Sequence, residues 1–141
     1  MNEYIEFAQR NPLLVMGFFA VLGLIIWTEF GRLTRKYKQL DVSQAVLLMN
    51  RDETVVLDVR EDKELGDGKI QNARHIVLKD LSKRIKELDK DKDKPILVYC
   101  RTGNRSGQAC GILSKAGFSD VSNLGGGIAA WESANLPVNK R

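Results

Sequence analysis

The sequence predicts an α/β protein with a parallel sheet, preceded by one transmembrane helix. After about residue 39, short apolar runs bounded by turn residues alternate with amphipathic stretches, which is the pattern of parallel strands joined by crossover helices. Before that point, eighteen uncharged and mostly apolar residues, 11–28, lie between Arg10 and Glu29, and this is the minimal length for a membrane span. The chain has 141 residues, so one globular domain is expected beyond the apolar segment.

The apolar segment is expected to form an uncleaved membrane anchor. Asn11 can cap a helix whose first position is Pro12, and a helix from Pro12 to Phe30 is about 28 Å long, against a hydrocarbon core of about 30 Å. Trp27, Phe30 and Tyr37 suit the aromatic belt at one membrane interface.

Two alternatives to an anchor remain open. A cleaved signal peptide has a basic N-terminal region and a small-residue cleavage site, but here Glu3 and Glu6 precede Arg10 and no such site follows the apolar run. A buried core helix is less favoured, because the remaining hundred or so residues need no fully apolar helix.

The flanking charges predict the orientation of the span. The side before the span has the cation Arg10, whereas the other side has four, which are Arg32, Arg35, Lys36 and Lys38. By the positive-inside rule the N-terminus lies outside and the globular domain lies in the cytoplasm, at the inner membrane of a bacterial-type cell. The predicted parts are an extracytoplasmic segment 1–11, a span 12–30, a basic juxtamembrane linker 31–37 and a domain 38–138.

Strands and helices alternate along this domain. Strands are expected at the apolar runs 54–58 and 95–99, and shorter ones near 38–40, 75–77 and 120–122. Helices are expected at 43–49, 80–88, 106–116 and 128–133, where the second has Leu81, Ile85 and Leu88 on one face. The run from Asp89 to Lys94 alternates in charge and is expected to be a solvated loop.

The segment with the most chemical information follows the strand 95–99 and precedes a helix of small residues. Its members are Cys100, Arg101, Thr102, Gly103, Asn104, Arg105 and Ser106. A loop that turns into a helix at the carboxyl end of a parallel strand directs backbone N–H groups at one point, so an anion is expected there. These amides, the helix dipole and the two arginines are expected to favour the thiolate of Cys100. A lone cysteine at a strand end is usually a small core residue, but the whole combination has few other physical uses.

Other polar residues are expected to have structural roles. Asp58 lies at a strand's carboxyl end on the same sheet edge as Cys100, and Arg60 is expected to pair with an acid such as Asp62 or Glu64. An ion-pair or turn network is the favoured interpretation for Asp58 and Arg60, with ordering of the site by hydrogen bonds as the alternative.

Three further features are assigned to packing. Cys110 lies among apolar residues of the helix after the loop, and His75 lies in a strand without ligand partners at metal-binding spacing. The glycines 125–127 are expected to form a turn into the last helix, where Trp131 packs on the core.

These motifs resemble the rhodanese family of sulfurtransferase domains over residues 38–138. Besides the loop 100–106, the matching pieces are Val-Leu-Asp-Val-Arg at 56–60, Gly-Lys-Ile-Gln-Asn-Ala at 68–73 and Gly-Gly-Gly-Ile-Ala-Ala-Trp at 125–131. Lys69 and Asn72 stand where many members have His and Gly. The resemblance implies a three-layer α/β/α domain with a five-stranded parallel sheet, and a persulfide that forms on Cys100.

The implied function is transfer of a sulfane sulfur from a small anionic donor, such as thiosulfate, to a thiol or cyanide. No metal or organic cofactor is implied. The near-neutral domain, with +2 over residues 41–141, argues against nucleic acid as a partner, while the lipid membrane is the expected one. Protein partners are not indicated. Members with five residues between Cys and Arg resemble phosphatases and arsenate reductases, because a tetrahedral oxyanion needs a wider ring of amides, and this chain has four. The alternative from another class is an anchored binding or scaffold module.

Overall fold

The computed structural model describes residues 1–33, 36–51 and 53–140. Arg35, one of the four cations in the predicted orientation signal, lies outside the described residues. The chain divides into two compact units, residues 1–35 and 36–141.

The first unit consists of two helices, α1 (Asn2–Arg10) and α2 (Pro12–Leu33). They are separated at Asn11, whose side chain and backbone N–H both bond the carbonyl of Phe7. The segment Pro12–Gly31 is long and apolar enough to cross a membrane, and none of it is buried in the structure. By length and composition it suits a membrane anchor or a signal sequence. The predicted span Pro12–Phe30 lies within this helix, while α1 was not predicted.

The second unit contains the five-stranded parallel sheet that was expected. Its strands are β1 (Lys38–Leu40), β2 (Val55–Asp58), β3 (Arg74–His75), β4 (Ile96–Tyr99) and β5 (Val121–Leu124), in the order β1-β5-β4-β2-β3. The third strand ends at His75 instead of Val77, because Val77 is the N-cap of the next helix. The fifth extends to Leu124, because Asn123 and Leu124 still pair with β1.

The helices of this unit are α3 (Val42–Met49), α4 (Leu78–Arg84), α5 (Asn104–Lys115) and α6 (Gly127–Ser133), with 3₁₀ turns at Asp62–Asp67 (η1) and Ile85–Asp91 (η2). The single helix predicted over 80–88 is wrong in its second half, where η2 turns Leu88 and Asp91 inward. The run 89–94 is also not simply a solvated loop, since the buried Asp91 carboxylate lies 2.7 Å from Arg74 and 3.1 Å from Lys94.

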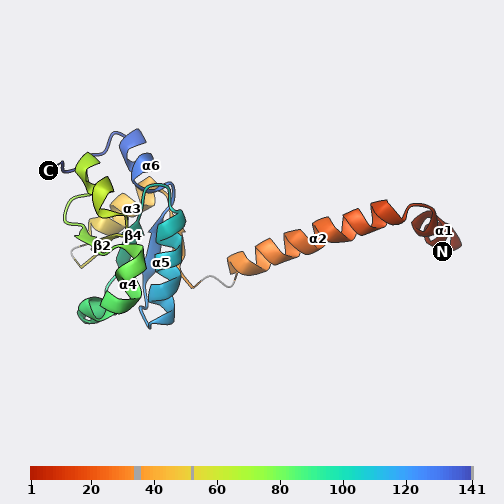
Figure 1. The fold of residues 1–141 in the computed structure, drawn as a ribbon, viewed down its shortest axis with the longest axis horizontal. Helices are drawn as coiled ribbons and strands as arrows, with labels where there is room; N and C mark the ends of the chain where they lie inside the picture. The colour runs from red at the N-terminus through yellow and green to blue at the C-terminus, as the bar shows by residue number, and fades with distance from the viewer. Residues whose placement is uncertain (34–35, 52, 141) are drawn as a thin grey trace. The chain divides into compact units, whose positions relative to one another are not determined.

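Helices cover both faces of the sheet (Figure 1), and an apolar core lies on each face. Side chains of α4, η2 and α5 cover one face, and those of α3 and α6, including the buried Trp131, cover the other. Along β4 the side chains alternate between the cores, as the period of two in a strand requires. Val98 and Cys100 face the α4–α5 core, and Tyr99 faces the α3–α6 core. Tyr37, assigned above to the membrane interface, is half-buried and packs against the α4–α5 core.

Candidate active site

The loop between β4 and α5 begins with Cys100, which is fully buried at the carboxyl end of the central strand. Gly103 is the N-cap of α5, with φ +101°, so the helix begins at Asn104, two residues earlier than predicted. A side chain at Gly103 would lie 3.4 Å from backbone atoms of Gly126 and Leu124. The positive φ is the reason for glycine here, because it allows the chain to turn into the helix, whereas the space would admit a Cβ.

The sulfur of Cys100 accepts hydrogen bonds from its own loop. The backbone N–H of Gly103 lies 3.1 Å from Sγ, and the hydroxyl of Ser106 lies 3.4 Å from it. Burial raises the pKa of the Cys100 thiol, but hydrogen bonds from the Ser106 hydroxyl and from the amides of Ser106, Gly103 and Thr102 outweigh it and lower the pKa below its ordinary value. The main stabilising groups are thus this hydroxyl and the amides, ahead of the two arginines.

Ser106 is oriented by Asn123, a buried residue of β5 that was not singled out in the sequence. The Ser106 hydroxyl lies 2.6 Å from Asn123 Oδ1, and the Asn123 amide donates to the carbonyl of Gly103 and to the side chain of Gln39. A hydroxyl has one proton to donate, and a charged acceptor binds it more strongly. We therefore expect the proton to turn toward sulfur when Cys100 is a thiolate.

The first residues of α6 bind the back of the loop. The backbone N–H groups of Ile128 and Ala129 donate to the carbonyls of Cys100 at 2.9 Å and Arg101 at 3.1 Å. Gly127 has φ +60°, and a Cβ there would lie 2.4 Å from the Arg101 carbonyl oxygen. The start of α6 therefore lies close enough to bind the carbonyls of Cys100 and Arg101 by hydrogen bonds. The sequence predicted only a turn at this point.

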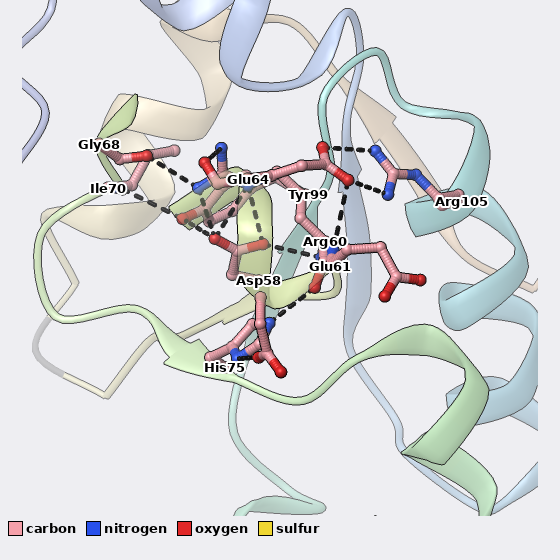
Figure 2. Close-up of polar contacts among 10 residues, drawn as sticks. Asp58, Arg60, Glu61, Glu64, Gly68, Ile70, His75, Tyr99 and Arg105 are labelled. Carbon is pink, nitrogen blue, oxygen red and sulfur yellow. Dashed lines mark hydrogen bonds and ion pairs between the residues drawn. The ribbon is translucent and has the colours of Figure 1, made fainter. Parts of the chain in front are cut away.

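Asp58, Arg60 and Tyr99 form a buried network at the ends of β2 and β4 (Figure 2). The Arg60 guanidinium donates to both oxygens of Asp58 at 2.8 to 3.1 Å, and the Tyr99 hydroxyl donates to Asp58 at 2.8 Å. The expectation that Arg60 pairs with Asp62 or Glu64 is wrong, because its only bond to Glu64 is to the main-chain carbonyl, at 3.4 Å. The carboxylate of Asp58 is the nearer acceptor, and it needs a cation because it is fully buried.

The two loop arginines have different surroundings. Arg105 forms a bidentate ion pair with Glu64 of η1, at 2.6 Å and 2.9 Å. Arg101 is exposed and lines a pocket of about 100 Å³ together with Glu64, Asp67 and Glu132. Among the described residues, its side chain has no hydrogen bond or ion pair. The sequence placed Glu64 near Arg60, but gave no signal for Arg105 as its partner.

His75 and Cys110 form no hydrogen bond to the sulfur of Cys100 among the described residues. His75 Nε2 lies 2.6 Å from the carbonyl of Arg60, which holds its ring in place. Cys110 is a free, buried cysteine of α5, and burial raises the pKa of its thiol to about 12. No group of three or more histidine, cysteine or acidic side chains in the described parts is arranged to bind a metal ion.

Known proteins are similar to this chain in sequence and in fold. The family of the rhodanese-like domain matches residues 41–134. YibN of Escherichia coli (strain K12) is 32% identical over 139 residues, which are 98% of this chain and 97% of YibN. The thiosulfate sulfurtransferase GlpE of Pseudomonas putida (strain F1) is 34% identical over 98 residues, covering 70% of this chain and 87% of GlpE. The crystal structure of a rhodanese-related protein from Thermoplasma volcanium superposes with a TM-score of 0.67 at 32% identity, covering 74% of this chain and all of that one.

The fold and the site therefore define a class of protein. It is an α/β/α domain with a cysteine in an amide-lined loop after its central strand. The chain belongs to the rhodanese-like domain family. The resemblance inferred from the sequence is confirmed, and relatives that are named sulfurtransferases support a general function in sulfur transfer.

Proposed function

We propose that this protein is a membrane-anchored sulfurtransferase that carries a sulfane sulfur as a persulfide of Cys100. The observation that carries this proposal is the position of Sγ, which accepts hydrogen bonds from Gly103 and Ser106 in a loop that lowers the pKa of the thiol. A thiolate is the reactive form of cysteine toward sulfane sulfur.

The exchange has two steps. The Cys100 thiolate attacks the outer sulfur of thiosulfate, a new S–S bond forms, and the S–S bond of the donor breaks with its electron pair leaving on sulfite. A thiol or cyanide then attacks the terminal sulfur and regenerates the thiolate, with thiocyanate as the product from cyanide. The amides of residues 101–106 hold the persulfide between the steps. This exchange requires neither a metal ion nor an organic cofactor.

Access to the sulfur is restricted. Cys100 exposes no surface, so the loop around it must move before a donor reaches Sγ. The sequence assigns both Arg101 and Arg105 to the attraction of the anionic donor and to the stabilisation of charge on the departing sulfite. Because Arg105 is paired with Glu64, we assign this role to Arg101. Asp58 and Arg60 support the strand ends beneath the loop.

Mass spectrometry after treatment with thiosulfate tests the nucleophile. We expect one added sulfur on the wild-type protein and on Cys110→Ser, and none on Cys100→Ser. Sulfur on Cys100→Ser but not on Cys110→Ser, with both variants folded, refutes the assignment. No adduct on any of them favours the alternative of a binding or scaffold module.

Phosphoryl transfer is the weaker chemical alternative. Four residues separate Cys100 from Arg105, so we expect negligible hydrolysis of aryl phosphates, and slower sulfur transfer when one residue is inserted between them. Efficient phosphatase turnover that depends on Cys100 contradicts the proposal.

We further propose that residues 12–30 anchor the domain 38–138 to the inner membrane. Segment 1–11 then lies outside the cell membrane, and both the linker 31–37 and the domain lie in the cytoplasm. The apolar segment Pro12–Gly31 of α2 and the four cations that follow it in the sequence support this topology. The reducing cytoplasm protects the free thiol and supplies thiol acceptors.

Both native cysteines are buried, so the labelling test uses introduced ones. In a variant without Cys100 and Cys110, a membrane-impermeant thiol reagent on intact cells labels Asn2→Cys but not Lys86→Cys, which is exposed on η2. The reverse pattern, or a mature protein that begins after residue 28, refutes the topology.

A further inference from the structure

The carboxylate of Glu64 occupies the terminal nitrogens of Arg105. Its two oxygens lie 2.6 Å and 2.9 Å from them, and the side chains are only 17% and 33% exposed. Figure 2 shows the pair beside the Asp58–Arg60 network. A bidentate arginine–carboxylate pair is geometrically specific and strong. The pair uses one N–H of each terminal nitrogen and compensates the charge of the guanidinium, so an anion that enters the loop meets a neutralised arginine.

Glu64 is itself held in place by the backbone around it. Its Oε1 accepts the backbone N–H of Glu61 at 3.3 Å, within the capping box of η1. The guanidinium of Arg60 donates to the carbonyls of Glu64 and of Gly68, the C-cap of η1. Since Arg60 is fixed by the buried Asp58, the pairing with Arg105 is built into the fold and does not depend on a mobile surface chain.

Arg101 differs from Arg105 in this respect. Its side chain is exposed at the pocket beside the loop, and no carboxylate of the described residues pairs with it, although Glu64 and Glu132 line the same pocket. One of the two loop arginines is thus paired with a carboxylate and the other is not. From the loop sequence alone, two unpaired arginines would be expected.

We propose that Glu64 is a specificity-determining residue that neutralises Arg105 and so favours sulfur donors of low charge, such as monoanionic persulfides, over the thiosulfate dianion. The inference rests on the proposed function of Cys100. Its physical basis is that the electrostatic energy of capture scales with the product of the charges, so an unpaired Arg105 favours a dianion twice as strongly as a monoanion on a logarithmic scale.

Three variants form a charge series at constant loop length. Glu64→Gln adds one positive charge at the mouth, Arg105→Gln removes one, and the double variant restores the neutral pair. The measurement is the second-order rate constant for persulfide formation on Cys100 in single turnovers. Thiosulfate serves as the dianionic donor and benzenethiosulfonate as the monoanionic donor.

For thiosulfate at low salt we expect Glu64→Gln to be fastest, the wild type and the double variant to be about equal, and Arg105→Gln to be slowest. Each step is on the order of fivefold. For the monoanion each step is about the square root of that factor. Added salt brings the four proteins together, because exposed charges are screened within about 10 Å at 0.1 M ionic strength.

Glu87→Gln is the matched control. It breaks another bidentate pair, with Arg84 at 2.7 Å and 3.1 Å, and changes the net charge by the same amount on η2. We expect rates equal to the wild type with both donors.

Several outcomes overturn the inference. If Glu64 only supports the loop, Glu64→Gln slows both donors by the same factor. If Arg105 binds the donor directly in the wild type, the double variant is much slower than the wild type. If Glu64→Gln fails to fold, the rates of Arg105→Gln and of the double variant are compared instead. A double variant that reacts with thiosulfate no faster than Arg105→Gln refutes the proposed role of Glu64. Absence of a Cys100 persulfide in the wild type refutes the proposed function itself, whereas a persulfide with no charge series refutes only this inference.

Discussion

Replacement of Gly127 by alanine tests how the last helix supports the reactive loop. Gly127 has φ +60°, and its Cβ would lie 2.4 Å from the carbonyl oxygen of Arg101 and 2.5 Å from that of Cys100. The left-handed conformation alone costs an alanine roughly 1–2 kcal/mol. Relief of the clash also stretches the two hydrogen bonds from the start of α6 to these carbonyls, each worth about 1 kcal/mol. We expect a loss of about 3–4 kcal/mol in the free energy of unfolding.

Gly117→Ala is the control for this prediction. Gly117 has φ +97°, but a Cβ there meets no atom within 4 Å, so it isolates the backbone cost of roughly 1–2 kcal/mol. Urea unfolding measures both variants, and the rate of persulfide formation on Cys100 reports the loop. We expect Gly127→Ala to slow this rate about tenfold or more, because small misplacements of a reacting group are costly, and Gly117→Ala to leave it unchanged. Equal destabilisation of the two variants, with unchanged persulfide formation, would refute the reasoning.

Three other predictions concern the polar groups of the site. Ser106→Ala should raise the pKa of the Cys100 thiol, measured by the ultraviolet absorbance of the thiolate against pH; an unchanged titration would show that the amides suffice. Tyr99→Phe removes the hydroxyl that bonds the buried carboxylate at the end of β2 and should lower the free energy of unfolding by about 1–3 kcal/mol, so a variant as stable as the wild type would contradict this. The hydrogen bond from Arg105 lowers the pKa of Glu64 from 4.5 to about 2, so the pair stabilises the fold fully above pH 4.5 and loses this effect as pH falls toward 2. The difference in thermal stability between the wild type and Glu64→Gln should therefore shrink over that range, and a constant difference would count against the pair.

The elements themselves could be predicted because their signals are local. The runs 54–58 and 95–99 are apolar, β-branched and bounded by turn residues, and each contains a strand. The prediction was less accurate where tertiary packing chooses between similar local structures. Residues 85–91 have a helical apolar period, yet they form a 3₁₀ helix that buries Asp91 beside Arg74, a residue seventeen positions away.

The loop 100–106 could also be located from the sequence, since its composition and its place after the strongest strand both point to an anion. The partners of its side chains could not. Several acids lie near Arg60 in the sequence, and burial of the Asp58 carboxylate decided which one it pairs with.

By itself, the sequence determined the parallel α/β domain, the apolar N-terminal helix and the cysteine loop at the end of the central strand. These features follow from periodicity, the length of each apolar run and residue type, which are local properties of the sequence. Only the tertiary structure decided that Glu64 neutralises Arg105 across forty-one positions, that Asn123 orients Ser106, and that Gly127 lies against the carbonyls of the loop. These contacts join segments far apart in the chain. Their choice depends on which polar groups lose water together at one sheet edge, and a linear pattern does not contain that information.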